Sequence, residues 1–402
     1  MQKVKVVQFG IGGWGWHFFE NALATWPDSD YAYEGAIDPN ARQSPIYDKL
    51  LQLGIPVYES PEAFYSEHQA DLAVITASLP AHCPMTLLAL SHGSNVLCEK
   101  PAAGTLHDVD LMLEAAQKAG RFVAINFNRC YAPASVNAKR DFLAGKFGRP
   151  KRFRIRSICG RDDSYYFRNY WSSRILDING EVVLDSVLCN GTSHELQHAL
   201  FMQGARLDAA ACPVAFRADL LRANPIETFD TCVLDARTDA GAEVLCYVTH
   251  ATDYTEFPVY DYEYENACLR YNRGVWGDDL IAFMKDGSVI HYGEAFPDGT
   301  RTMKLCAQAI LNKTQPVCGL EASRVHVLTI NALADYAHVS GFPACDIKRD
   351  EAKKATTVPG LGEKMVQCYD DCCLLSDKGY YSLKPAEWTD ISAYSGYLGG
   401  RF

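Results

Sequence analysis

The stretch Val4-Lys-Val-Val-Gln-Phe-Gly-Ile-Gly-Gly-Trp-Gly15 decides the fold of the first part of the chain. Its apolar start, 4–9, predicts a β-strand, and the segment 14–26 after it has helical spacing. Between them the glycines follow the pattern G-x-G-x-x-G, which allows a tight turn, a close approach of backbone N–H groups to a pyrophosphate, and close helix–strand packing. We therefore predict a dinucleotide-binding turn with the phosphates at a helix N-terminus. The residues expected to hold the cofactor there are Gly10, Ile11, Gly12, Gly13, Trp14 and Gly15.

Strands and helices continue to alternate as far as residue 125. The unbroken apolar run 72–76 is typical of a strand in a parallel sheet that is covered on both faces. Alternation of this kind indicates right-handed crossovers and an α/β fold with a doubly wound parallel sheet. The further expected strands are 33–37, 95–98 and 121–125, and the expected helices are 42–53, 83–91 and 106–119.

The pattern changes after Tyr131, where long β-rich stretches have few helices between them. This predicts a second domain with a mainly antiparallel sheet. The β-rich stretches are 151–158, 228–238, 242–252 and 258–271, and the expected helices are 136–144, 191–202, 323–339 and 363–375.

Composition excludes several classes of protein. The chain has 38 Lys and Arg against 49 Asp and Glu, a net charge of −11, so neither nucleic acid nor an anionic membrane surface is an expected partner. Prolines at 80 and 84 interrupt the uncharged stretch 72–98, so no membrane span is expected. The fifteen cysteines include no C-x-x-C pair, and the amino terminus is interpreted as a strand rather than a signal peptide. We expect a reduced cytoplasmic protein without a metal site.

Asp38 follows the second expected strand and bears on the choice of cofactor. A carboxylate at that strand end accepts both ribose hydroxyls and repels a 2′-phosphate, which favours NAD over NADP. Arg42 keeps NADP open, because a nearby arginine can accept the extra phosphate. As a purely structural alternative, Asp38 is a turn former ahead of Pro39.

Two further groups are candidates for acid–base chemistry. Glu99-Lys100-Pro101 follows a buried strand at the edge where such sheets bind ligands, and a lysine there can hold or protonate a substrate oxygen. His194, after Asn190-Gly-Thr-Ser, is expected at a helix start and is a candidate proton carrier. Each residue also has a structural alternative. Lys100 can form an ordinary ion pair at the strand end, and His194 can be a buried histidine with its hydrogen bonds satisfied.

In order along about residues 4–340, these motifs resemble the Gfo/Idh/MocA family of oxidoreductases, named for glucose–fructose oxidoreductase and inositol dehydrogenase. Besides the glycine turn, Asp38-Pro39-Asn40 and Glu99-Lys100-Pro101, the matching elements are Asp71-Leu-Ala-Val-Ile-Thr76, Pro80, His82, Gly93, Asn128-Arg129, Gly148-Arg149-Pro150, His194 with Gly204, and Gly319-Leu-Glu-Ala322. The Glu-Lys-Pro element is the most specific of them.

The resemblance implies a Rossmann NAD-binding domain over 1–130 and a substrate and oligomerisation domain over 131–345, which is an α/β domain with an open, mainly antiparallel sheet. It also implies a carboxyl-terminal extension over 346–402 that packs on the other domains. It implies a homodimer or homotetramer, because the open sheet usually carries subunit contacts. Hydride would pass between nicotinamide and a hydroxyl-bearing carbon of a sugar, glycoside or cyclitol. Lys100 matches the family's catalytic lysine and His194 its histidine acid/base. The cofactor would lie near the glycine turn and near Asp38, Ser78, His82, Glu99 and Asn128.

The sequence departs from the family at Asn190, where dehydrogenases usually have an aspartate four residues before the histidine. An amide can hold the imidazole or a substrate hydroxyl, but it cannot stabilise an imidazolium by charge, so His194 is expected to be a weaker base. Asp185 is the nearest acidic replacement, although it is out of register. Trp171 with Arg174 resembles, at a different spacing, a pair near the nicotinamide in some members.

Two clusters have a functional and a structural interpretation. Tyr165, Tyr166 and Tyr170 can stack on a sugar, although aromatic clusters are more often core. Cys368, Cys372 and Cys373 lie on the expected last helix, where packing is the default and a metal or redox site is the alternative.

Two other functions remain open. One is a redox-neutral glycosidase, lyase or epimerase that uses tightly bound NAD through a transient keto-sugar. Asn190 and the carboxyl-terminal extension motivate it, since both depart from simple dehydrogenases. The other is a non-catalytic NAD-sensing protein, which the presence of Lys100 and His194 disfavours.

Overall fold

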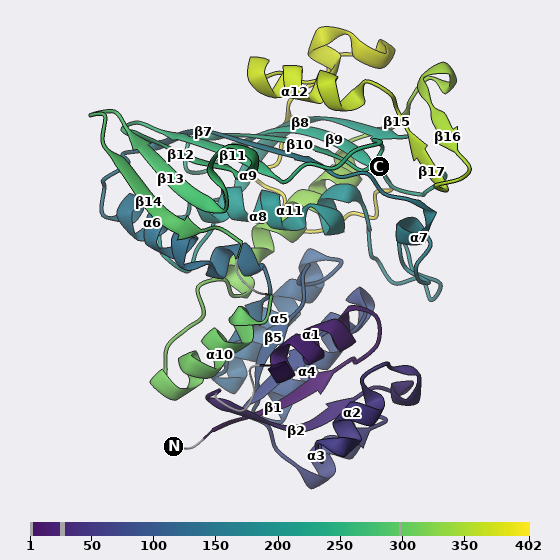
Figure 1. The fold of residues 1–402 in the computed structure, drawn as a ribbon, viewed down its shortest axis with the longest axis vertical. Coiled ribbons are helices and arrows are strands. Elements are labelled where there is room, and N and C mark those ends of the chain that lie inside the picture. Colours follow the sequence, from purple (N-terminus) through teal and green to yellow (C-terminus); the bar gives the residue numbers. More distant parts are fainter. Residues whose placement is uncertain (1–2, 25–28, 297–298) are drawn as a thin grey trace. The chain divides into compact units, whose positions relative to one another are not determined.

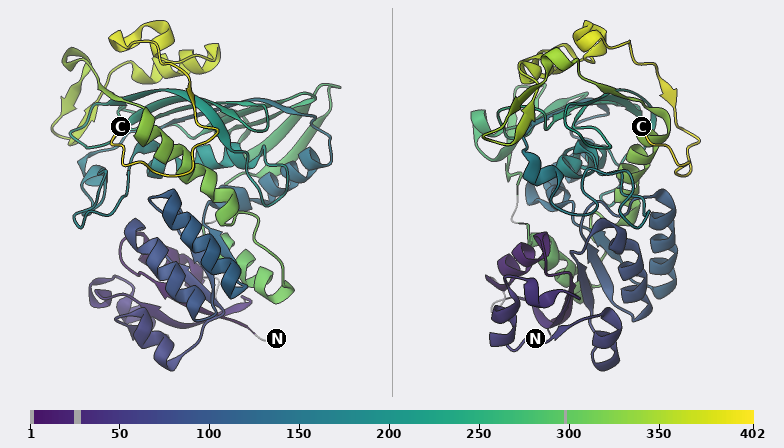
Figure 2. Two further views of the ribbon diagram at one scale, coloured as in Figure 1. Left: turned by 180° about the vertical axis from the view of Figure 1, so that it is seen from behind. Right: turned by 90° about the vertical axis from the view of Figure 1, so that its right-hand side faces the viewer.

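A computed structural model describes residues 3–24, 29–296 and 299–402 (Figures 1 and 2). The chain forms two compact units. The first contains the chain up to Ala103, His107–Tyr131 and the stretch that ends at Arg324. The second contains Gly104–Leu106, Ala132–Phe296 and Val325–Phe402.

The first unit is built on a parallel sheet with the strand order β3-β2-β1-β4-β5-β6. This order, with crossovers on both sides of β1, confirms the predicted doubly wound parallel sheet. The strands are β1 (Val4–Phe9), β2 (Tyr31–Ile37), β3 (Val57–Tyr58), β4 (Leu72–Ile75), β5 (Asn95–Cys98) and β6 (Val123–Ile125).

The helices of the first unit mostly match the predicted spans. The expected helix over 42–53 is wrong in its first half, because Pro45 ends the 3-10 turn before a shorter helix begins. Trp26, the last residue of the first expected helix, lies outside the described residues. The helical elements are α1 (Trp14–Ala24), η1 (Ala41–Gln43), α2 (Tyr47–Gln52), α3 (Pro61–Glu67), η2 (Leu79–Ala81), α4 (His82–Ser91), α5 (Leu106–Ala119), η3 (Asn128–Tyr131) and α10 (Arg301–Asn312).

Helix α10 completes the core of the first unit although it lies far along the chain. Met303, Cys306 and Ala307 are fully buried in one apolar cluster with Phe19 and Tyr33. The hydroxyl of Tyr33 lies 3.5 Å from the Met303 sulfur. Helix α10 is not among the helices expected from sequence, although its apolar residues recur at helical spacing.

The second unit is built on a larger sheet with the order β14-β13-β12-β11-β7-β10-β9-β8-β15, and β18 pairs with β8. The pairs β7–β10 and β8–β15 are parallel and the others are antiparallel, which confirms a mainly antiparallel sheet. The strands are β7 (Pro150–Ile158), β8 (Pro213–Arg222), β9 (Thr231–Thr238), β10 (Glu243–Thr249), β11 (Val259–Tyr264), β12 (Ala267–Asn272), β13 (Asp279–Met284), β14 (Val289–Glu294), β15 (Val339–Gly341) and β18 (Thr389–Asp390), with a separate hairpin of β16 (Lys348–Asp350) and β17 (Ala355–Thr357).

Helices cover both faces of this second sheet (Figures 1 and 2). Helix α8 (Ser193–Phe201) lies against β7 and β10 on one face, and α12 (Leu361–Asp371) packs on the same strands from the other. Leu361 and Met365 of α12 are fully buried against Leu245 and Tyr247. The remaining helical elements are α6 (Pro133–Leu143), α7 (Asp163–Tyr166), the π-helical turn η4 (Val187–Gly191), α9 (Arg273–Trp276), α11 (Leu320–Tyr336), η5 (Ala344–Asp346), η6 (Ser376–Lys378) and η7 (Tyr380–Ser382).

Three observations concern the described ranges as a whole. None of the helices they contain combines the length and the apolarity needed to cross a bilayer. They contain no group of three or more His, Cys, Asp or Glu residues placed to hold a metal ion. The fifteen cysteines all lie in these ranges and form no disulfide.

Candidate functional site

The turn between β1 and α1 has the geometry that its glycines predict. Gly10 has φ +88°, and a Cβ on it would lie 2.8 Å from the backbone nitrogen of Ala77. A Cβ on Gly15 would collide with the Gly10 carbonyl oxygen. Both positions therefore require glycine, the first for its left-handed backbone and the second for the close start of α1. Because these residues have no side chains, the turn leaves open the space that a dinucleotide pyrophosphate needs.

Asp38, at the end of β2, is held against this turn. Its Oδ2 accepts the backbone N–H of Ile11 at 2.9 Å, and its Oδ1 accepts that of Asn40 at 2.8 Å. The Oδ2 atom also lies 3.8 Å from where a Cβ on Gly12 would stand. The carboxylate is therefore fixed beside the glycine cradle, and this placement fits the ribose that joins a dinucleotide pyrophosphate there.

Two buried polar side chains that the sequence analysis missed support the turn from below. Gln8 of β1 donates its amide to the Gly15 carbonyl at 2.9 Å and to the Thr76 hydroxyl at 3.0 Å. Thr76 in turn donates to the Gly10 carbonyl at 2.6 Å. A glutamine among the apolar residues that end this strand, directly before the glycines, is the signal that identifies this support.

Glu99 links three strand ends of the first unit. Its Oε1 accepts the Trp14 indole N–H at 3.2 Å and the Asn126 amide at 2.6 Å, and its Oε2 accepts the backbone N–H of Lys100 at 3.2 Å. Lys100 is half-buried at the end of β5. Asn126 was not predicted. Asn128, which was, begins η3 and has a buried Oδ1 without a hydrogen-bond partner in the structure.

His82 is buried between two backbone segments at the same edge of the sheet. Its Nδ1 lies 2.9 Å from the Pro101 carbonyl and its Nε2 3.2 Å from the Ala77 carbonyl. Burial lowers the pKa of the imidazole, and the charge of Lys100 lowers it further. His82 therefore holds the loop after β4, which contains Ser78, to the loop that carries Lys100.

In the second unit, His194 lies in the first turn of α8, as predicted, and is half-buried. The preceding residues form the π-helical turn η4 rather than a continuous helix, and Asn190 lies within it. Single π-turns next to helices are frequent at functional sites. The Asn190 amide donates to Asp185 Oδ1 at 2.9 Å, so the acidic residue that appeared out of register does reach this turn.

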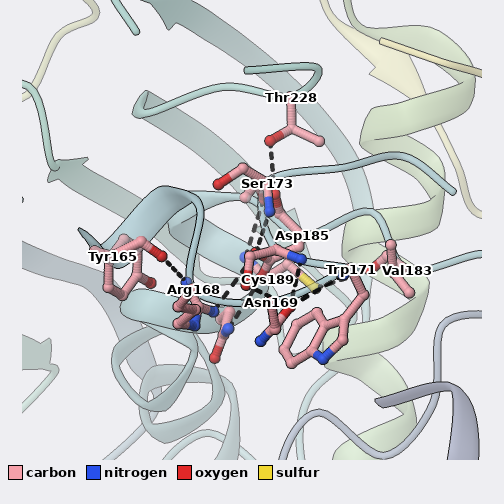
Figure 3. Close-up of polar contacts among 12 residues, drawn as sticks. Tyr165, Arg168, Asn169, Trp171, Ser173, Val183, Asp185, Cys189 and Thr228 are labelled. Atoms are coloured by element: carbon pink, nitrogen blue, oxygen red, sulfur yellow. Dashed lines mark hydrogen bonds and ion pairs between the residues drawn. The ribbon is translucent and has the colours of Figure 1, made fainter. Parts of the chain in front are cut away.

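Asp185 is the centre of a polar cluster in the second unit (Figure 3). Its Oδ2 accepts the backbone N–H of Ser173 at 2.6 Å and lies 3.7 Å from the Arg168 guanidinium. Its backbone oxygen accepts the Thr228 hydroxyl at 2.6 Å. Figure 3 shows Arg168 and Ser173, from one loop, and Thr228, from another segment, around Asp185. The carboxylate therefore fixes the loop that contains residues 165–173 onto the turn before His194.

Tyr165 and His250 pack against the same turn from the other side. A Cβ on Gly191 would collide with His250 Nε2 and would lie 2.9 Å from the Tyr165 hydroxyl. His250 Nδ1 lies 2.9 Å from the Cys159 carbonyl. Burial, together with the charge of Arg161, lowers the pKa of His250 to about 3, so its imidazole is neutral at physiological pH.

Contacts of the other aromatic and cysteine residues named from sequence are as follows. Tyr166 is buried, Arg174 lies 3.5 Å from the Glu227 carboxylate, and the Arg168 guanidinium lies 5.4 Å from the centre of the Trp171 ring. In the last helix the Cys368 side chain is buried against the sheet, as packing predicts.

Comparison with known proteins identifies what the first unit is similar to. Residues 4–127 match the model of the oxidoreductase family with an NAD-binding Rossmann fold, Gfo/Idh/MocA. The chain is 26% identical over 199 residues to an inositol 2-dehydrogenase of Rubrobacter xylanophilus, an alignment that covers 49% of this chain and 52% of that protein. It is 35% identical over 94 residues to an inositol 2-dehydrogenase of Salmonella typhimurium, covering 23% of this chain and 28% of the relative. The chain thus spans about half the length, or less, of these curated relatives.

The likeness to solved structures extends over both units. A structure described as an aldose–aldose oxidoreductase from Caulobacter crescentus, complexed with glycerol, has a TM-score of 0.66 at 17% identity. The alignment covers 83% of this chain and 96% of that one. At this identity the likeness concerns the fold.

Proposed function

The chain belongs to the Gfo/Idh/MocA oxidoreductase family, and from this premise we propose that it transfers hydride between NAD and a hydroxyl-bearing carbon of a sugar, glycoside or cyclitol. The observation that carries the proposal is the Asp38 carboxylate, which accepts the Ile11 N–H beside a glycine cradle that admits no side chain. That arrangement suits NAD, because a second anionic group at the ribose would be repelled by Asp38.

The proposed chemistry assigns a separate role to each polar residue. NAD, when bound, supplies a hydride acceptor, which is chemistry that no side chain provides. Loss of hydride from carbon requires loss of the proton from its oxygen, so a base must reach that hydroxyl. We assign the base to His194 and the stabilisation of the oxygen to Lys100, whose ammonium favours developing negative charge.

Asn190 is assigned a positioning role. Its amide N–H donates a hydrogen bond to Asp185, which carries the negative charge of this cluster. An aspartate at position 190 would place that charge on the turn itself, one hydrogen bond closer to His194. The imidazolium of His194 would therefore receive less stabilisation than in an aspartate–histidine pair.

The test uses purified protein with NAD and a panel of sugars, glycosides and cyclitols, and it follows the absorbance of NADH. At least one compound should give NADH, and Lys100→Ala and His194→Ala should each lower kcat by about 100-fold or more, as expected for loss of an acid–base group. His291→Ala is the control, because His291 is exposed at β14 and paired with Asp279. Absence of NADH with every member of the panel contradicts the proposal.

One observation favours a second candidate, a redox-neutral reaction with retained NAD. The hydrogen bond from Trp14 to Glu99 joins the glycine turn to the end of β5. If this hydrogen bond closes over a bound nucleotide, it slows exchange of the cofactor. Mass spectrometry of the protein as purified separates the two cases. A stoichiometric nucleotide supports the redox-neutral reaction, and an empty protein supports the simple dehydrogenase.

A further inference from the structure

Among the described residues, Arg161 differs from the partly buried arginines of β7 in its lack of an ion pair. Along β7, Arg154 forms an ion pair with Asp261 at 2.7 Å and Arg156 with Glu256 at 2.6 Å. Across the part of the chain that the structure describes, Arg161 forms no ion pair, and its buried Nε has no hydrogen-bond acceptor. A half-buried guanidinium that lacks a carboxylate has lost hydration without compensation.

The neighbouring acids are already engaged. Asp185 accepts from Ser173 and Asn190 and pairs with Arg168. Asp230, which is fully buried, accepts from Asn224 at 2.8 Å. Asp162, next to Arg161 in the chain, accepts the Ser164 hydroxyl at 2.5 Å and the Tyr165 N–H at 3.3 Å. Within the described ranges, none of these three carboxylates forms an ion pair with Arg161.

The surroundings of Arg161 orient its guanidinium without neutralising it. The backbone N–H of Arg161 donates to the His250 carbonyl at 3.2 Å, and the guanidinium carbon lies 4.8 Å from the centre of the Tyr165 ring. The Arg168 guanidinium lies 4.4 Å from the same ring. His250 is neutral and buried, so it adds no charge of either sign. Two guanidinium groups therefore flank the Tyr165 ring, while Asp185 pairs with Arg168 and Asp162 caps the start of α7 by accepting the Tyr165 N–H.

Arg161 belongs to the same side-chain cluster as the turn before His194. The Tyr165 ring, which contacts Arg161, places its hydroxyl 2.9 Å from the position of a Cβ on Gly191. Gly191 ends η4, the turn that contains Asn190, two residues before α8 begins. Within the second unit, the Arg161 guanidinium therefore belongs to the side-chain cluster around the turn that contains Asn190.

We propose that Arg161 binds an anionic group of the substrate, so that the substrate class is an acidic sugar or a sugar phosphate rather than a neutral polyol. The guanidinium offers a planar fork of N–H donors that matches a carboxylate or a phosphate with two parallel hydrogen bonds. The inference rests on the proposed function in taking the ligand to be a sugar, and it adds the charge that the sugar carries.

The experiment measures binding rather than turnover. Wild-type protein saturated with NAD, so that the glycine turn is filled, is titrated calorimetrically with matched sets of sugar acids, sugar phosphates and their neutral parent sugars. At least one acidic member should bind about tenfold or more tightly than its neutral parent, the range expected for a charge-assisted hydrogen bond. Preference for the carboxylate or for the phosphate set identifies which anion is used.

Variants then locate the interaction. Arg161→Gln should abolish the preference for the anion while leaving binding of the neutral parent unchanged, and Arg161→Lys should keep part of it. Arg206→Gln is the control, because Arg206 is an exposed arginine of the same unit that pairs with Asp208 at 3.0 Å. The proposal is overturned if no acidic member binds more tightly than its parent, or if Arg161→Gln keeps the preference. Anion binding without NADH formation would count against the proposed function and leave the role of Arg161 supported.

Discussion

Asn190 donates its side-chain amide to Asp185 at 2.9 Å, one helical turn ahead of His194. Asp185 also accepts the Ser173 N–H at 2.6 Å and lies 3.7 Å from Arg168. Asp185, which is out of register with the site in the sequence, thus holds the turn that precedes His194.

Asp185→Asn should reduce the free energy of unfolding by about 1–3 kcal/mol, since it leaves buried donors without a charged acceptor. It should also lower kcat, because the turn before His194 loses its anchor. Chemical denaturation and steady-state kinetics measure the two effects. Asp208→Asn, at an exposed ion pair, should change stability by less than about 1 kcal/mol. Unchanged stability in Asp185→Asn would show that the cluster does not hold the loop.

Gly191→Ala should destabilise the protein by about 1–3 kcal/mol, because the added methyl group overlaps the His250 ring. His250→Ala in the same chain makes room and should restore part of the loss, which a double-mutant cycle measures. Gly396→Ala is the matched control, since a Cβ there meets nothing within 4 Å. Strictly additive effects of the two substitutions would mean that Gly191 is required for another reason.

His250 should make stability fall in acid. Its pKa is about 3 in the folded chain, mainly because of burial, against an ordinary value of 6.5. Below pH 6.5 the unfolded chain therefore takes up a proton that the folded chain does not. This contribution to stability is present above the unfolded value and is lost, by about 1.4 kcal/mol per pH unit, as the pH falls towards the folded value.

Comparison with His250→Gln isolates this effect from the other titrating groups. The free energy of unfolding of the wild type minus that of the variant should be constant above neutral pH. Between about pH 6 and pH 4 it should fall, because only the wild type loses the contribution of His250. A difference that does not depend on pH would place the pKa of His250 near its ordinary value.

Asp38→Ala should weaken NAD binding and remove the discrimination against NADP. The carboxylate is the anionic group fixed beside the glycine cradle, through the N–H groups of Ile11 and Asn40. Titration with each nucleotide measures the change, with Asp48→Ala on α2 as an exposed acidic control. If the preference between NAD and NADP is unchanged, another residue, with Arg42 the nearest candidate, selects the cofactor.

The first unit could be predicted from sequence because each of its strands and helices is marked by the residues within and next to it. The span of β5 and the span of α5 are those predicted, since apolar runs and helix-ending glycines mark them directly. Helix α10 was missed because its partners, Phe19 and Tyr33, lie almost three hundred residues earlier, and only the folded core shows why it is apolar.

The sequence indicated which residues belong to the candidate site but not which of them contact one another. His194 and Asn190 could be named from their order along the chain. Asp185 could not be connected to them, because the π-turn η4 inserts extra residues per turn and shifts the register. The unpaired charge of Arg161 is likewise invisible in sequence, where Arg154 and Arg156 look the same as it does.

The most direct test of the account follows a labelled hydrogen. The protein is incubated with NADH that carries deuterium at the transferable position and with keto derivatives of sugars and cyclitols, acidic members included, and the products are examined by mass spectrometry and NMR. The account predicts a product alcohol with deuterium on its carbinol carbon, and no such product with Lys100→Ala or His194→Ala. Deuterium that stays in the cofactor with every acceptor would contradict it.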